Sequence, residues 1–161
     1  MRKAALAACL AAAAIAFSLP AAAEDKTPPY LSLRPKEANM RSGPGYRYPT
    51  AWVYRRPGLP FKVLAEFEGW YKVEDSEGAK GWFHQSMVSR RRTARAMSPH
   101  TVRKAPGEDS APLARVAAGA VGRIERCRAD ADWCRVRWPG GYEGWSPRSA
   151  LFGLAAGETV D

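Results

Sequence analysis

The sequence repeats itself, and this repeat constrains the fold more than any other feature. Arg41 recurs as Arg103, 62 residues later, and other matched segments keep nearly the same spacing. These segments are Gly69-Trp70 with Asp132-Trp133, Gly81-Trp82 with Gly144-Trp145, and Ser86-Met87-Val88 with Ser149-Ala150-Leu151. A constant period of this length indicates one supersecondary unit that is built twice. The 161 residues therefore predict two copies of one small domain.

Each copy has the pattern of a small antiparallel β-barrel. Short apolar or alternating runs are interrupted about every ten residues by Gly, Pro, Asp or Asn, which is typical of strands and turns. No stretch after residue 23 shows sustained helical periodicity. The expected strands are 50–54, 60–67, 70–74 and 79–83 in the first copy, and 113–117, 121–128, 132–137 and 142–146 in the second. The residues expected in the first core are Val63, Trp70, Val73 and Trp82.

The N-terminus reads as a secretory signal peptide. A basic start at residues 1–3 precedes an apolar stretch at 4–19 and an Ala-rich cleavage site that ends at Ala23. The apolar stretch is too short and too rich in Ala to predict a membrane span. The segment Leu6-Ala7-Ala8-Cys9 has the local form of a lipoprotein signal, but it follows the basic start too closely. We expect cleavage after Ala23, a periplasmic or secreted product, and no transmembrane segment.

The charge is strongly basic, with 25 Lys and Arg residues against 16 Asp and Glu residues. Removal of Arg2 and Lys3 with the signal would leave a formal charge of 23 − 16 = +7. Outside the cytoplasm such a charge attracts anionic polymers and lipid head groups, and export argues against nucleic acid as a partner. The basic run of Arg90, Arg91, Arg92 and Arg95 between the copies is interpreted as a solvated linker or as a contact for phosphates and carboxylates.

Two cysteines remain after the signal, Cys127 and Cys134. An even pair in an oxidising compartment predicts a disulfide, here across a strand, a polar turn and a second strand. Closing so short a loop stabilises by about 2.5 kcal/mol in the chain-entropy treatment. A redox pair usually has two residues between its cysteines, and a zinc site needs more ligands than this. We expect no metal and no cofactor.

At this point the chain resembles a known family. The segments Asn39–Pro44, Gly58–Val63, Gly69–Val73 and Gly81–His84 resemble the bacterial SH3-like domain, and Ser89–Ala94 is similar to a stretch in its exported tandem form in alphaproteobacteria. The resemblance implies an all-β fold with two tandem SH3-like barrels. The expected division is a signal peptide at 1–23, a lead at 24–35, domains at 36–92 and 99–154, a linker at 93–98 and a tail at 155–161. The second copy departs from the pattern, with Thr101 in place of Asn39 and Ala105 in place of Gly43.

The candidate binding residues belong to the first copy. The tryptophans shared by both copies are interpreted as core or barrel wall, or as the lining of a peptide groove such as SH3 domains use. The aromatic residues that lack counterparts in the second copy are better candidates for a contact surface, although loop packing also explains them. Arg41 and Arg103 either hydrogen-bond their own loops or present a cation to a ligand carboxylate. The candidate ligand-binding residues are Arg41, Tyr46, Tyr48, Trp52 and Tyr54.

The sequence does not predict an enzyme. Both cysteines of the mature part are expected to be paired, so a nucleophilic thiol beside a histidine is not expected. The sequence also lacks Gly-x-Ser-x-Gly and His-Glu-x-x-His motifs. The resemblance implies a non-catalytic binding module of the cell envelope that recognises cell-wall peptidoglycan or its peptides. The alternative is a periplasmic protein–protein adaptor that binds an extended peptide, and the sequence leaves the oligomeric state open.

Overall fold

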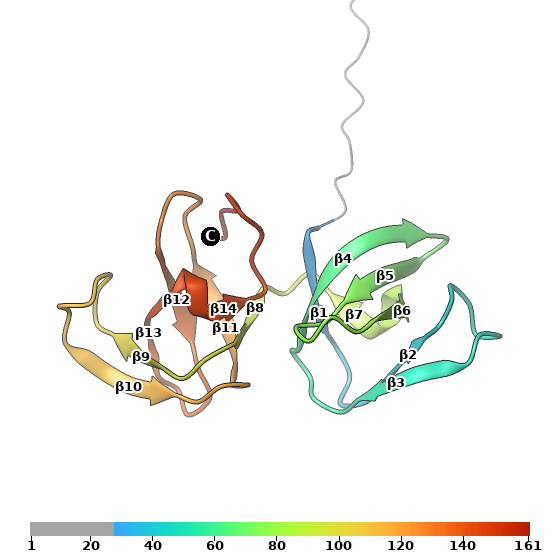
Figure 1. Cartoon of the computed structure of the whole chain (residues 1–161), viewed down its shortest axis with the longest axis horizontal. Helices are drawn as coiled ribbons and strands as arrows, with labels where there is room; N and C mark the ends of the chain where they lie inside the picture. Colours follow the sequence, from blue (N-terminus) through green and yellow to red (C-terminus); the bar gives the residue numbers. More distant parts are fainter. Residues whose placement is uncertain (1–27) are drawn as a thin grey trace, which may run out of the picture.

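The computed structural model describes residues 28–161, so the predicted signal peptide at 1–23 lies outside the described residues. These residues form two β-domains that lie side by side, the first in blue to green and the second in yellow to red (Figure 1). This confirms the expected all-β fold with two tandem domains. No helix within residues 28–161 is long and apolar enough to cross a membrane.

The first domain is a seven-stranded sheet with one short 3₁₀ helix. Its elements are β1 (Tyr30–Leu33), β2 (Ala38–Arg41), β3 (Thr50–Tyr54), β4 (Pro60–Phe67), β5 (Trp70–Glu74), β6 (Lys80–His84), η1 (Gln85–Met87) and β7 (Val88–Ser89). The strands lie in the order β3-β2-β6-β5-β4-β1-β7. Glu68 and Gly69 both have positive φ and form the tight turn between β4 and β5. Glycine adopts this backbone conformation at little steric cost.

The second domain repeats this order as β10-β9-β13-β12-β11-β8-β14. Its elements are β8 (Thr93–Ala96), β9 (His100–Arg103), β10 (Pro112–Val116), β11 (Val121–Arg126), β12 (Trp133–Arg137), β13 (Glu143–Pro147), η2 (Arg148–Ala150) and β14 (Leu151–Phe152). The eight strands that the sequence predicted are all present, and their ends shift by at most two residues. Short apolar or alternating runs bounded by turn residues made these strands recognisable in the sequence.

Six strands were not predicted, namely β1, β2, β7, β8, β9 and β14, and two of them, β1 and β8, lie outside the expected domain limits. β1 lies in the expected lead 24–35 and pairs with β4, and β8 lies in the expected linker 93–98 and pairs with β11. Every residue of β1 is buried, and three of the four in β8 are buried. Strands of four residues are too short for a sequence pattern to mark them. The expected linker segment 93–98 therefore contains a strand of the second sheet, β8.

The first core is built from aromatic rings. Tyr54, Phe61 and Phe83 meet edge to face, with ring centroids 5.0 Å apart for Tyr54 and Phe61 and 5.1 Å apart for Phe61 and Phe83. Val73 is fully buried in this core, as the sequence predicted, and Trp70 is buried as well but lies outside the cluster that contains Val73. Val63 is half-buried and packs against this core, whereas the prediction was wrong for Trp82, which is half-buried and lies outside it.

The second core reaches the same packing by a different set of residues. The strand registers place Gly122 where the first domain has Phe61, and Ser146 where it has Phe83. Trp138, which follows β12, fills the space and is only 3% exposed. Its Nε1 donates to Ser146 Oγ over 3.1 Å. A Cβ on Gly122 would lie 2.8 Å from the Trp138 ring, so glycine is the residue that admits the indole.

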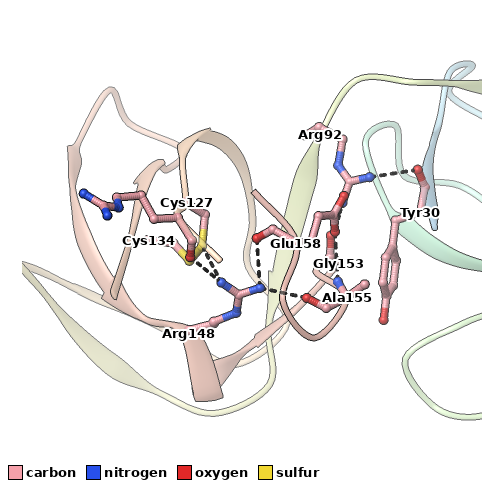
Figure 2. Close-up of polar contacts among 9 residues, drawn as sticks. Tyr30, Arg92, Cys127, Cys134, Arg148, Gly153, Ala155 and Glu158 are labelled. Atoms are coloured by element: carbon pink, nitrogen blue, oxygen red, sulfur yellow. Dashed lines mark hydrogen bonds and ion pairs between the residues drawn. A yellow bond between two sulfur atoms is a disulfide. The ribbon is translucent and has the colours of Figure 1, made fainter. Parts of the chain in front are cut away.

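The predicted disulfide between Cys127 and Cys134 is confirmed, and both cysteines are fully buried. It ties the chain just after β11 to β12. The C-terminal tail packs on it, because Val160 exchanges two backbone hydrogen bonds of 2.7 Å with Cys127. Arg148 donates to the carbonyl oxygens of Ala155 and Glu158 over 2.7 and 3.1 Å, which holds the tail against the disulfide (Figure 2).

Arginines carry the contact between the two domains. Arg92 donates to the carbonyl oxygen of Tyr30 in the first domain, and to Glu158 Oε2 and the carbonyl oxygen of Gly153 in the second, over 3.2, 2.9 and 2.8 Å (Figure 2). Its side chain is only 17% exposed. Arg95 reaches back to the first domain as well. Half of the basic run is thus structural, and the expectation of a solvated segment holds only for the exposed Arg90 and Arg91.

Candidate functional site

The candidate site begins with the loop between β2 and β3. Arg41, the last residue of β2, donates from Nη1 to the carbonyl oxygens of Tyr46 and Tyr48 over 3.1 and 2.7 Å. Arg103 holds the matching loop of the second domain in the same way, with a 2.7 Å bond to the carbonyl oxygen of Ser110. Of the two roles that the sequence left open for Arg41, the structure shows the first: the guanidinium positions its own loop.

The loop places Tyr46 against two residues from other parts of the sheet. Trp70 is the first residue of β5, and His84, the last residue of β6, is its direct cross-strand partner. The ring centroid of Tyr46 lies 5.0 Å from that of Trp70 and 5.7 Å from that of His84. The Trp70 and His84 rings are 5.2 Å apart. We call these three residues the Tyr46 cluster.

The Tyr46 cluster combines a buried ring with an exposed one. Trp70 is 7% exposed, whereas Tyr46 is 67% exposed. The three rings, together with Arg41 and Glu37, line a hollow of about 260 Å³. The Arg41 guanidinium carbon lies 5.5 Å from the centre of the Tyr46 ring. A flat aromatic surface with a phenol hydroxyl and a cation at its edge suits a ligand that has both small apolar groups and polar groups.

His84 is held in place by the short helix that follows it. Its Nδ1 lies 2.8 Å from Ser86 Oγ and accepts a 3.3 Å hydrogen bond from the Ser86 backbone N–H. This contact caps η1 and fixes the plane of the imidazole beside Trp70. The ring that faces the hollow is therefore oriented before any ligand arrives.

The second domain retains the loop but not the cluster. Trp133 occupies the position of Trp70, whereas Glu108 and Pro147 occupy the positions of Tyr46 and His84. Arg103 Nη2 forms a 2.9 Å ion pair with Glu108 in this loop. The aromatic surface is thus a property of the first domain alone.

The five predicted site residues fall into two groups. Arg41, at the end of β2, lies together with Tyr46 and Tyr48 of the β2–β3 loop. Trp52 and Tyr54 lie on β3 and line a separate cleft of about 920 Å³ between the two domains. The sequence grouped them because they are close in the chain, but the loop and the strand turn them toward different surfaces.

Tyr54 stabilises the fold and is not a freely exposed contact residue. Its hydroxyl donates to Asp75 Oδ2 over 2.7 Å. Burial, followed by the hydrogen bond and charge of Asp75, raises the pKa of Tyr54 above its usual value. The hydroxyl therefore stays protonated and remains a donor. Asp75 in turn accepts from the backbone N–H groups of Glu77 and Ala79, which fixes the β5–β6 turn.

Sequence reasoning missed Trp70 and His84 as site residues. Trp70, which recurs in the second copy, was interpreted as core, barrel wall or the lining of a peptide groove, and His84, which Pro147 replaces there, was given no role. The signal in the sequence that could have identified a site residue was a difference between the copies, because a residue that only one copy keeps is not needed for the shared fold. Within residues 28–161 the structure contains no cluster of His, Cys, Asp and Glu that could hold a metal ion.

Comparison with known proteins gives a family match. A family profile described as "Bacterial SH3 domain" matches residues 34–90 and 97–153. No curated protein matches the chain. Two solved structures that match are NlpC2 and NlpC1 from Trichomonas vaginalis, each 13% identical with a TM-score of 0.35. The matches cover 78% and 86% of this chain but only 48% and 50% of those proteins, so the chain spans about half of their length.

Proposed function

The chain belongs to the bacterial SH3 domain family, and from this membership we propose that it is a non-catalytic binding module of the cell envelope that recognises peptidoglycan through its first domain. Domains of this family are binding domains and are commonly cell-wall modules. The observation that carries the proposal is the Tyr46 cluster, an exposed aromatic surface that the second copy of the same fold does not contain.

The chemistry of the cluster fits the peptide stems of the wall. A stem peptide carries small apolar side chains, backbone amides and free carboxylates. The rings of Tyr46 and Trp70 offer a flat surface to the apolar groups, and Tyr46 is 67% exposed. The net positive charge of the chain attracts an anionic wall. The predicted signal peptide and the disulfide support a location in an oxidising compartment outside the cytoplasm.

Replacing Tyr46 by alanine is expected to weaken the binding of a soluble stem peptide about tenfold, because an exposed ring at a binding surface contributes on the order of 1 kcal/mol or more. Stability should hardly change, since Tyr46 is mostly exposed. Isothermal titration of the mature chain measures this. The matched control is Tyr142→Ala, which removes an exposed tyrosine from the second domain. Equal affinity of both variants for the stem peptide would rule out the Tyr46 cluster as the binding site.

One observation favours a second candidate function, that of an adaptor for an extended peptide of another protein. β3 is the edge strand of the first sheet and carries the uncharged segment Thr50–Tyr54. The matching edge strand β10 contains Pro112 and Arg115, residues that protect an edge from pairing. An unprotected edge can accept an added strand. Crosslinking through residues of β3 would recover one specific protein if the adaptor function is correct.

A further inference from the structure

We propose that the cleft between the two domains binds an uncharged, hydroxyl-rich oligosaccharide, with Trp52 as the platform on which one sugar ring stacks. The inference rests on the proposed function and deepens it, because it assigns the glycan part of the wall to a site separate from the Tyr46 cluster. Residues of both domains line the cleft, so the tandem arrangement itself creates it.

Trp52 is the first reason. Its indole is 56% exposed and lies in the cleft of about 920 Å³. The second domain has Ala114 at the matching position of β10, directly across from Val102 as Trp52 is from Met40. The fold therefore does not need an indole here. The apolar C–H face of a pyranose ring covers such a flat surface and removes it from water.

The second reason is that the cleft is already formed. Arg56 of the first domain donates from Nη1 to the carbonyl oxygen of Gly119 in the second, over 2.8 Å. Arg95 of the second domain donates to Ser76 and, over 3.0 Å, to Glu77 Oε1 in the first. These contacts lie along the cleft and fix its two walls relative to each other. A ligand would not have to bring the domains together, which reduces the cost of binding.

The third reason is the balance of charge. The cleft is lined by two carboxylates, Asp75 and Glu77, and two guanidinium groups, Arg56 and Arg95, in a chain whose net charge is +9. A neutral ligand with adjacent hydroxyls can both donate and accept here without leaving an ion unpaired. A charged peptide would bring a net charge next to groups that are already paired, and it would have to displace one of them.

The opposite wall also suits a sugar chain. It consists of Ala117, Ala118, Gly119 and Ala120, whose small side chains leave the backbone within reach of a ligand. The carbonyl oxygen of Gly119 accepts from Arg56, so this polar backbone group lies at the cleft. A chain of sugar rings can lie between an aromatic wall and a wall of small residues.

The test is an NMR titration of the mature chain with tetra-N-acetylchitotetraose, which is uncharged and carries no peptide. The Trp52 indole N–H signal, assigned by its loss in Trp52→Ala, is expected to shift in the wild type. Trp52→Ala should weaken binding about tenfold, as expected for the loss of an aromatic stack, and Trp52→Phe should retain most of it. Tyr46→Ala is the matched control and should bind the sugar as the wild type does.

The inference would be overturned by no shift at millimolar sugar, by equal affinity in Trp52→Ala, or by sugar binding that is lost in Tyr46→Ala instead. Loss of stem-peptide binding in Trp52→Ala with sugar binding unchanged would also overturn it, because the cleft would then be a peptide site. Failure here leaves stem-peptide binding at the Tyr46 cluster intact. Failure of the proposed function would instead appear as a wild type that binds neither stem peptides nor the wall.

Discussion

Replacing Trp138 by alanine is expected to destabilise the second domain by about 3–5 kcal/mol, the range for removal of a large buried aromatic side chain. Trp138 fills the space that Phe61 and Phe83 fill in the first domain, and Gly122 and Ser146 leave that space open. Alanine would create a cavity lined by Val136 and would leave the Ser146 hydroxyl without its donor. A domain this small has little stability to lose.

Chemical denaturation of the full mature chain, followed by far-ultraviolet circular dichroism, measures this effect. We expect Trp138→Ala to unfold the second domain at a much lower denaturant concentration while the first domain keeps its own transition. Trp52→Ala is the matched control, since it removes an exposed tryptophan and should cost little. If the two tryptophan variants unfold at the same midpoint, the description of the second core is wrong.

Removal of the disulfide is expected to cost about 2.5 kcal/mol from the loss of loop closure alone. The structure adds a consequence that the sequence did not predict, because the C-terminal tail packs on the cysteines. Val160 pairs with the backbone of Cys127, and Arg148 lies 3.4 Å from the Cys127 sulfur while it holds the tail (Figure 2). Glu158 of the same tail binds Arg92 at the domain contact. Reduction should therefore loosen the tail as well.

Thermal unfolding with and without a thiol reductant measures the loss of stability, and hydrogen exchange at the Val160 amide reports on the tail. We expect a lower Tm and faster exchange in the reduced wild type. The double variant Cys127→Ser/Cys134→Ser should resemble the reduced protein and should not respond to the reductant. An unchanged Tm in the reduced wild type would contradict a stabilising role for the disulfide.

The sequence predicted the repeat, most strands and the disulfide because these depend on local patterns. Trp70, Tyr71 and Val73 belong to one short run rich in apolar residues, and Gly69 marks the turn before it. The exchange of Phe61 for Gly122 was hidden because the offset between the copies is 61 residues there, not 62 or 63. Only the strand pairing reveals this shift, so the role of Trp138 could not be read from the repeat.

The candidate site was predicted in part for a related reason. Tyr46 stood out because the second copy has no aromatic residue at its position, and the structure places it at an exposed surface. Trp70 and His84 join it only after β5 and β6 pair, which a pattern along the chain does not show. Trp52 seemed to belong with Tyr46, but the strand directs it to the cleft.

The most direct test of the wall-binding proposal is co-sedimentation of the mature chain with purified peptidoglycan at physiological salt. The informative variant is Tyr46→Glu/His84→Pro, which gives the first domain the residues that the second domain has at these positions and should keep the fold. We predict that the wild type sediments with the wall and that the folded variant stays in the supernatant. A wild type that does not sediment, or a variant that sediments equally, would contradict recognition of peptidoglycan by the Tyr46 cluster.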